Sequence, residues 1–522
     1  MSWAAPSLTI SSSNCISDAL GEPVIQLTVS TMILRKLANL QVLPRLRGYY
    51  AAPQNLPFCL AAGLILFVFS LARYWIGYDP TSIIGPDFSE TWHLADNLRT
   101  NGHFANPFGP LDTGPSAHLA PAFPVFLALL TSLFGVHSVG AFAYKFTAVL
   151  AVSFLLALLP LVGRLLGMGV LTGVLAACIW LAAKPPLFPA WEAHYAGLLI
   201  AIATCCFRRL IGSTAPHLGV TLMLGFLVGL LTLLSPTCIP VFLCWLFWLG
   251  LSRKASLFRA PAVALIILPT MMVSPWIVRN YLVFDRIILV RDNLGLELSV
   301  SNNDCAAFGV RVQIDSGCFQ KVHPNGNMVE AAKVLAMGEA RYNELRLHEA
   351  GHWITGNSHR FMSLCIQRLV AFWLPHDSEN LSREIFQPGR RAERYSIYLM
   401  TFLSIVGLWV TARRDVKSAT VCSIWLWVYP TIYYFVQFED RYRYPIMWVT
   451  FLLGAVPLSI VIEWLWNLSI RRAIDIVDGN TIETDRARGR QNIASRRNYI
   501  IRSAEDQTDR TEAPHRPCKR IQ

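Results

Sequence analysis

Apolar blocks separated by short polar stretches make up most of the chain between residues 58 and 466. A bilayer core of about 30 Å needs about 20 residues at helical rise, and helices are among the few structures that satisfy their own backbone groups in lipid. The blocks approach this length. They predict membrane-spanning helices over 58–76, 139–162, 167–183, 190–207, 217–234, 236–251, 260–278, 395–411, 418–437 and 445–466.

One further apolar segment, 121–135, is short for a crossing and carries Pro121 and Pro124 at its start. It is typical of a tilted or re-entrant segment. Together the blocks predict an all-α polytopic membrane protein with about 10–11 transmembrane helices, in one transmembrane domain over 58–466.

Clusters of Lys and Arg indicate how the helices are oriented, because short cytoplasmic loops are enriched in these residues. The clusters lie at 35–36, 45–47, 208–209, 253–254, 413–414 and 471–472. Their alternation places the segments 1–57 and 467–522 in the cytoplasm and two polar loops, 77–118 and 278–394, outside. It also requires that one of the four apolar segments before Arg208 does not cross, and we expect this of 121–135.

The two ends of the chain add little chemistry. Residues 1–30 lack a charged start before an apolar run, so they are not typical of a signal peptide, and Met32 opens a basic stretch that suits a true start. The tail 467–522 mixes charged and small polar residues without apolar periodicity, which favours disorder.

Composition agrees with a membrane protein, since 54% of the residues are apolar and only 15% are charged. The formal charge of +12 suits contact with anionic lipid. Nucleic-acid binding is the competing interpretation of a basic chain, but the cations here are spread over loop edges and the tail, so we expect no nucleic-acid partner. Charges inside the apolar blocks are scarce, which disfavours an ion-coupled transporter.

Twelve cysteines lie mostly in the apolar blocks, where a thiol behaves as a small apolar group. Cys305 and Cys318 lie 13 residues apart in the second polar loop. They can form one disulfide if that compartment is oxidising.

The first polar loop contains two carboxylates, Asp87 and Glu90, three residues apart and just beyond the first block. On a helical turn they share one face. A partly desolvated carboxylate at this depth suits a general base, because burial raises its pKa towards working pH. The alternative is structural: Asp87 follows Pro86 and precedes an amphipathic stretch, as helix N-caps do.

Four stretches resemble the membrane glycosyltransferases of the GT-C class. The first loop carries the helix ETWHLADNL, the turn NGHFANPF and the stretch TGPSAHLAPAFPVFLALL. The others are SPWIVRNYLVFDRIILVRDNLGLELSVSNN, HRFMSLCIQRLVAFW and FEDRYRYP. The sequence is most similar to the bacterial branch of protein mannosyltransferases, aminoarabinose transferases and Rgt-type lipopolysaccharide sugar transferases, and the likeness covers most of residues 32–466.

The resemblance implies transfer of one sugar from a polyprenyl-phosphate donor to a lipid, glycan or protein acceptor on the outer face of the cell membrane. It implies a loop carboxylate as base, which falls on Glu90, while the acidic residue general to the class falls equally well on Asp87. Some members of the class use a divalent metal. The sequence departs from its relatives around Asp87.

Such a reaction also needs cations, because negative charge builds up on the leaving phosphate and Arg binds it through paired hydrogen bonds. The candidates for the donor phosphate flank the ends of two blocks: Arg279, Arg291, Arg441 and Arg443. His118 and Tyr444 are candidates for binding substrate. The alternative for these residues is anchoring at the membrane interface, where Arg and Tyr side chains reach the headgroups.

A second motif competes with this assignment. Residues 348–352 read HEAGH, a match to H-E-x-x-H, in which His348 and His352 would hold zinc and Glu349 would act as base of a membrane metalloprotease. The extended form of the motif fails, because Gly356 and His359 each fall one residue late. The flanking sequence is that of a charged amphipathic helix, so the zinc interpretation is the weaker alternative.

Overall fold

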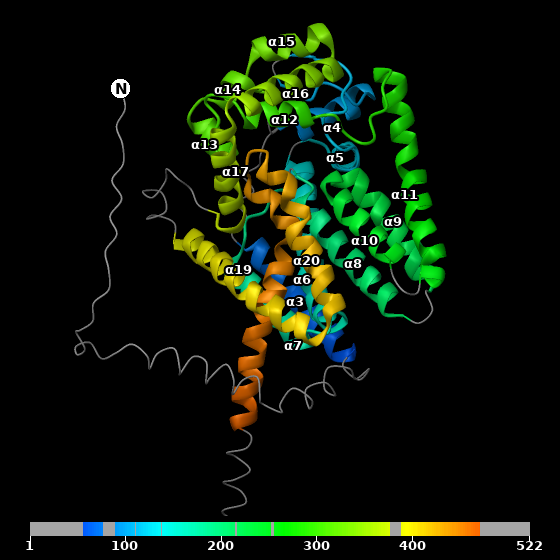
Figure 1. Ribbon diagram of the computed structural model, residues 1–522, viewed down its shortest axis with the longest axis vertical. Coiled ribbons are helices and arrows are strands. Elements are labelled where there is room, and N and C mark those ends of the chain that lie inside the picture. The colour runs from blue at the N-terminus through cyan, green and yellow to red at the C-terminus, as the bar shows by residue number, and fades with distance from the viewer. Residues whose placement is uncertain are drawn as a thin grey trace, which may run out of the picture. The chain divides into compact units, whose positions relative to one another are not determined.

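The computed structural model describes residues 56–76, 89–109, 111–136, 138–189, 191–213, 217–251, 255–375 and 388–469, which all belong to one compact unit, Gln54–Gln522. Over these ranges the chain is helical, and the β pairs there are the isolated bridges Ala105↔Pro115 and Gly309↔Phe438 (Figure 1). The expectations for Met32, for the leading segment 1–55 and for the tail after residue 469 concern residues outside these ranges.

Six helices within the described ranges are long and apolar enough to cross a membrane. The chain is thus an all-α polytopic membrane protein, as the apolar blocks predict. The six spans are α3 (Leu56–Trp75), Val139–Leu165 of α6 (Ser138–Leu165), α8 (Ala193–Gly212), Pro261–Phe284 of α11 (Ala255–Phe284), Glu393–Arg414 of α19 (Pro388–Arg414) and Tyr444–Ser469.

Four further apolar helices are shorter: α5 (Ala122–Phe134), α7 (Val170–Ala183), α9 (Leu218–Leu234), and Pro236–Leu251, which joins η2 (Pro236–Cys238) to α10 (Ile239–Leu251). The 13 residues of α5 measure about 20 Å at helical rise, short of a bilayer core. With 14 residues, α7 is nearly as short. The structure therefore has two short helices where the charge pattern predicts one segment that does not cross.

The predicted span 418–437 is wrong in its extent. The α-helix there, α20 (Val416–Trp427), ends after 12 residues and continues as the 3-10 helix η3 (Tyr429–Tyr434). Pro430 explains the change, because proline has no backbone N–H and disfavours the α conformation of the residue before it. The helix before the second polar loop differs too, since α11 runs to Phe284 rather than to residue 278.

Helix packing follows the distribution of apolar and small residues. Large apolar side chains on α3, among them Phe58, Leu64 and Phe69, are exposed, as expected of a helix that faces lipid. Inside the bundle, α19 packs closely on the helix Tyr444–Ser469 through glycine. A Cβ on Gly407 would lie 1.8 Å from the Leu453 carbonyl oxygen, so only glycine fits there.

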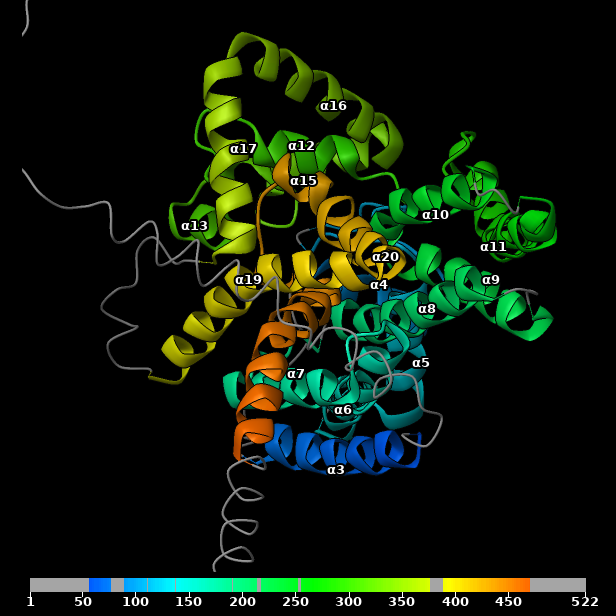
Figure 2. The ribbon, with the colours of Figure 1, turned by 60° about the horizontal axis from the view of Figure 1, so that its bottom comes forward.

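The polar loops fold into short helices that gather at one end of the bundle (Figure 1). The first loop forms α4 (Glu90–Asn101). The second forms α12 (Leu294–Ser301), α13 (Val310–Asp315), α14 (Phe319–Val322), α15 (Met328–Met337), α16 (Glu339–Gly356) and α17 (Ser358–Trp373). In Figure 2, α12, α15, α16 and α17 again lie together, and α17 runs on to pack against η3.

Candidate functional site

Glu90 is the first residue of α4, and local sequence explains why the helix begins there. The Ser89 side chain caps the helix by accepting a hydrogen bond from the Trp92 amide at 3.3 Å, and Gly102 ends it in the left-handed region with φ 69°. The capping role considered for Asp87 thus belongs to Ser89. Asp87 itself lies outside the described residues.

The Glu90 carboxylate is nearly buried, with 13% of its side chain exposed. Its pKa is raised to about 7, chiefly by burial and also by the charges of Glu297 and Glu439, while Arg441 lowers it. His323 lies beside it, with Nε2 3.7 Å from Glu90 Oε1. A carboxylate with a pKa near 7 is matched to proton transfer at neutral pH.

His323 is a neutral neighbour of Glu90. Burial, together with the charge of the nearby Arg346, lowers its pKa to about 3. Its Nδ1 accepts a hydrogen bond from the Asn325 amide at 3.1 Å, so the proton of the neutral ring resides on Nε2, facing Glu90. Sequence reasoning missed this residue, because nothing in its neighbourhood marks a buried histidine.

Arg441, in η4 (Asp440–Tyr442), supplies the positive charge of the site. Its Nε lies 2.5 Å from Glu439 Oε2, and its guanidinium carbon lies 3.2 Å from the centre of the Trp191 ring. Among the described residues its Nη1 is buried without a hydrogen-bond partner. Its Nε has no hydrogen-bond partner there either, so Glu439 holds the arginine as an ion pair and Trp191 by stacking, while two of its nitrogens stay available as donors.

Glu297 on α12 is a third carboxylate of this cluster. Burial raises its pKa, whereas Arg291 and Arg441 lower it, and its Oε1 accepts a hydrogen bond from Asn293 Nδ2 at 3.3 Å. Neither Glu297 nor Glu439 was singled out by the sequence, although both lie in stretches that carry the family resemblance. Their role becomes visible only once α12 and the segment before the last helix meet.

Arg291 also belongs to this cluster. Its charge acts on Glu297 and on His118, and within the described ranges its side chain makes no hydrogen bond or ion pair. Its guanidinium is therefore uncommitted, as a phosphate-binding arginine needs to be.

Arg279 holds the first polar loop instead. Its Nη1 donates to the Ser116 carbonyl at 2.7 Å and its Nη2 to the Phe104 carbonyl at 2.9 Å, while its guanidinium stacks on the Trp276 ring at 4.8 Å. Both nitrogens are thus occupied by backbone oxygens. The structure gives this arginine a part in shaping the loop.

Arg443 is likewise engaged, and it is buried. Its Nη1 donates to the Trp373 carbonyl at 2.7 Å and to the Phe372 carbonyl at 3.2 Å, and its Nη2 donates to Thr401 Oγ1 at 2.7 Å. It ties the end of α17 to α19. Of the four arginines expected at the donor phosphate, Arg291 and Arg441 are therefore the two that lie with Glu90 and Glu297.

His118 and Tyr444 occupy different surroundings. His118 is buried against the Phe108 ring, and burial lowers its pKa, with His323 and Arg291 adding to the effect. The Arg291 charge therefore lies close to His118. The ring of Tyr444 packs edge-on against His194 at 4.2 Å, inside the helix bundle.

Glu339, the first residue of α16, joins the two polar loops and was missed from sequence. Its Oε1 accepts a hydrogen bond from the Ala117 amide at 2.6 Å, next to His118. Its pKa is raised to about 7, because burial outweighs the hydrogen bonds from Ser116 and Ala117, which lower it. The Ala117 carbonyl in turn accepts from the Asp292 amide at 2.8 Å, so the backbone before His118 is fixed from both sides.

We expect Glu339→Gln to remove part of the pH dependence of stability. A carboxylate whose pKa is raised by folding stabilises below its unfolded pKa near 4.5, and this contribution is lost as pH rises through about 7. The loss is on the order of 3 kcal/mol for a shift of this size. Glutamine still accepts from Ala117, so the unfolding midpoint of the variant in detergent should fall less than that of the wild type between pH 5 and 8.

Glu344→Gln on the same helix is the control, because Glu344 is exposed and pairs with Arg286 at 2.8 Å. Its midpoint should follow the wild type at every pH. Equal pH dependence in Glu339→Gln and the wild type would contradict the buried, protonated carboxylate.

The HEAGH motif lies on α16 with His348 and His352 both exposed. The carboxylate of Glu349 accepts a hydrogen bond from Arg346 Nη1 at 2.7 Å. Over the described ranges, no three side chains of His, Cys, Asp or Glu are grouped so that they could hold a metal ion. The motif therefore lacks a third ligand within these ranges. The described residues around Glu90 form no such metal-binding group either.

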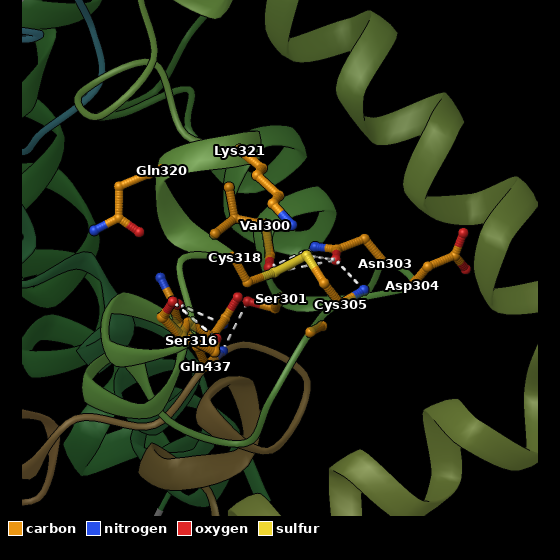
Figure 3. The surroundings of a disulfide bond; sticks show 12 residues. Val300, Ser301, Asn303, Asp304, Cys305, Ser316, Cys318, Gln320, Lys321 and Gln437 are labelled. Atoms are coloured by element: carbon orange, nitrogen blue, oxygen red, sulfur yellow. Dashed lines mark hydrogen bonds between the residues drawn. A yellow bond between two sulfur atoms is a disulfide. The ribbon is translucent and has the colours of Figure 1, made fainter.

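Cys305 and Cys318 form a disulfide, as their shared loop predicts. Figure 3 shows the bond beside α12, with Asn303 next to both sulfurs and Gln437 close to Ser301. Asn303 Oδ1 accepts a hydrogen bond from the Cys305 amide at 3.0 Å. The bond closes the part of the second loop that contacts the segment leading to Glu439 and Arg441.

No family model matches the sequence. No curated protein matches it either.

Solved structures with a similar fold include the oligosaccharyltransferase AglB of the archaeon Archaeoglobus fulgidus in complex with an inhibitory peptide and a dolichol-phosphate, at 14% identity over 80% of this chain and 51% of that one, with a TM-score of 0.48. The apo form of the oligosaccharyltransferase from the same organism is 15% identical over 80% of this chain and 52% of that one, with a TM-score of 0.48. Its complex with Zn and sulfate is 14% identical over 77% of this chain and 49% of that one, with a TM-score of 0.47. The chain spans about half the length of these structures.

Proposed function

We propose that this protein is a membrane glycosyltransferase that moves a sugar from a polyprenyl-phosphate donor to a hydroxyl-bearing acceptor, with Glu90 as general base. One observation carries the proposal: Glu90 is a buried carboxylate with a pKa of about 7 that shares its surroundings with Arg441. A base tuned to neutral pH and a cation in one nearly dry site are what transfer from a phosphate leaving group requires.

The reaction follows from this arrangement. The acceptor oxygen attacks the anomeric carbon, a new C–O bond forms, and Glu90 takes the proton of the acceptor hydroxyl. The bond from the anomeric carbon to the phosphate oxygen breaks, and the leaving phosphate keeps the electron pair. Arg441 and Arg291 stabilise the charge that accumulates there. Among the described residues, no three His, Cys, Asp or Glu side chains are grouped so that they could hold a divalent metal.

The position of both arginines supports a lipid-borne donor. Arg441 lies three residues before the helix Tyr444–Ser469, and Arg291 lies seven residues after α11 ends at Phe284. A polyprenyl chain in the bilayer would present its phosphate at this level. The acceptor would then approach from the layer of loop helices, where His118, neutral because its pKa is lowered, can contact it.

The site is proposed to face the extracytoplasmic side of the cell membrane. The Cys305–Cys318 disulfide supports this orientation, because disulfides form and persist in oxidising compartments. Asp87, three residues before Glu90, remains the alternative base. The acceptor is a lipid, glycan or protein of the cell envelope.

Deletion of the gene tests the proposed function. Mass spectrometry of lipid-linked and surface glycans should show that the mutant accumulates one polyprenyl-phosphate sugar and lacks that sugar on an envelope acceptor. Re-expression of the wild-type chain should restore both. Glycans identical to those of the parent strain would overturn the proposal.

We expect Arg291→Ala to weaken donor binding more than folding. The Arg291 side chain makes no hydrogen bond or ion pair with described residues, so its loss removes only its charge interactions with Glu297 and His118 there. Loss of a charged hydrogen bond to phosphate should raise KM for the donor by about tenfold or more, since 1.4 kcal/mol corresponds to a factor of ten. The thermal midpoint in detergent should stay within about 2 °C of the wild type.

The comparison variant is Arg443→Ala, which removes hydrogen bonds to Phe372, Trp373 and Thr401. It should lower the thermal midpoint clearly. An Arg291→Ala protein with unchanged KM for the donor would remove Arg291 from the phosphate site.

A further inference from the structure

Arg368 on α17 is fully buried, and no carboxylate among the described residues forms an ion pair with it. Its Nη1 donates to the Phe435 carbonyl at 2.9 Å and to Asn302 Oδ1 at 3.1 Å, and its Nη2 donates to the Ser301 carbonyl. Burial lowers its pKa to about 10. A buried guanidinium without a counter-ion is costly, so its hydrogen bonds to oxygen atoms of two separate segments need an explanation.

The two segments that Arg368 joins are the end of α12 and the extended stretch 435–438. Direct hydrogen bonds also connect them: Asn302 Nδ2 donates to the Phe435 carbonyl at 3.1 Å, and the Gln437 amide donates to Ser301 Oγ at 2.7 Å. The side chain of Ser301 and that of Gln437 can be followed beside the disulfide in Figure 3.

The loop closed by the disulfide holds the same stretch from its other side. The Phe438 amide donates to the Phe308 carbonyl at 2.8 Å, and the Val310 amide donates to the Phe438 carbonyl at 2.9 Å. Gln313 Nε2 donates to Gln437 Oε1 at 2.8 Å. Residues 435–438 are therefore held mainly by the second polar loop, including Arg368.

Each of the two segments carries charged groups of the site. Glu297 precedes Ser301 by one helical turn on α12, and Glu439 and Arg441 directly follow the stretch 435–438. We propose that Arg368 is a positioning residue that fixes α12 and residues 435–442 relative to each other, so that Arg441 stays beside Glu297 and Glu90. The positioning role rests on the proposed function, whereas the bridge between the segments does not.

The direction of the effect follows from how each segment is supported. α12 is also held by α16, where Asn343 Oδ1 accepts from the Leu296 amide at 3.3 Å. The stretch keeps its bonds to Ser301 and to the disulfide-closed loop, but it loses the Arg368 bond at Phe435, so we expect weakening of Arg368 to loosen residues 435–442 rather than α12. Around Glu90 lie Glu297 on α12, Arg441 and Glu439 on the moving stretch, and the neutral His323 after α14. Arg441 lowers the pKa of Glu90 more strongly than Glu439 raises it. When both move away from Glu90, the pKa of Glu90 therefore rises.

Arg368→Lys is the test variant, because lysine keeps the charge but replaces the planar fork with a single ammonium group. Arg360→Lys on the same helix is the matched control, since Arg360 is exposed and makes one 3.4 Å hydrogen bond to the Ala306 carbonyl. Hydrogen exchange followed by mass spectrometry reports the Gln437 and Phe438 amides without any need for activity. We expect exchange at 435–442 to accelerate by about tenfold or more in Arg368→Lys and to stay unchanged in Arg360→Lys.

The pH profile of sugar transfer is the second measurement. We expect the acid limb of kcat/KM to move up by about half a pH unit or more in Arg368→Lys, which a general loss of folded protein would not cause. Exchange at 435–442 equal to the wild type would overturn the bridge. Faster exchange with an unmoved acid limb would overturn the positioning role. If the wild type transferred no sugar, the proposed function would fail, and the exchange result would still decide whether Arg368 joins the two segments.

Discussion

Glu90→Gln is expected to abolish sugar transfer while the protein still folds and inserts. Glutamine has the shape of glutamate but cannot take the proton of the acceptor, and general base catalysis is worth about 10²–10⁴-fold in rate. The substitution also removes a carboxylate that burial already disfavours in its charged form. We therefore expect kcat to fall by about a hundredfold or more with no loss of thermal stability.

Asp96→Asn is the matched control for Glu90→Gln. Asp96 lies on the same helix, is exposed and pairs with Arg99 at 2.6 Å, so its loss should leave transfer within about twofold of the wild type. Asp87→Asn separates the two candidate bases. Full activity of Glu90→Gln together with an inactive Asp87→Asn would transfer the role of base to Asp87.

Arg441→Lys is expected to have the second largest effect. The guanidinium of Arg441 stacks on Trp191 at 3.2 Å and pairs with Glu439 at 2.5 Å, and a lysine ammonium cannot do both. Lysine keeps one positive charge, so folding should be retained. A displaced charge stabilises the leaving phosphate less well, and we expect kcat to fall by about a hundredfold.

Arg441→Met should go further, because Glu90, Glu297 and Glu439 then lose the cation that they share. The pKa of Glu90 rises when this charge is removed, so residual activity should require higher pH. Arg413→Lys is the control, since Arg413 stacks on Trp409 at 5.4 Å and is exposed. Equal transfer rates in Arg441→Lys and Arg413→Lys would contradict the proposal that Arg441 stabilises the leaving phosphate.

The membrane helices were predictable because lipid imposes a long apolar run that can be recognised locally. The helix ends were less so. Pro430 ends α20 early, and α11 continues through polar residues to Phe284 because Arg279 finds partners in the first loop. The Pro430 effect is local, whereas the Arg279 contacts join segments more than 100 residues apart, which no local pattern records.

The candidate site shows the same division. Glu90, Arg291 and Arg441 were predicted from charge type and position at the ends of helices, and the structure brings their charges together. Glu297, His323 and Glu339 were missed, because their chemistry comes from burial between loops. Arg279 and Arg443 have the charge that a phosphate site needs, but backbone carbonyls already occupy their donors.

The pH dependence of sugar transfer by the purified protein tests the central claim most directly. The donor is the polyprenyl-phosphate sugar that accumulates in the deletion strain, and kcat/KM is measured from about pH 5 to 9. The rate should rise with pH along an acid limb centred near 7, as Glu90 becomes ionised, and Glu90→Gln should lack this limb. Transfer that is independent of pH over this range, or unaffected in Glu90→Gln, would contradict the account.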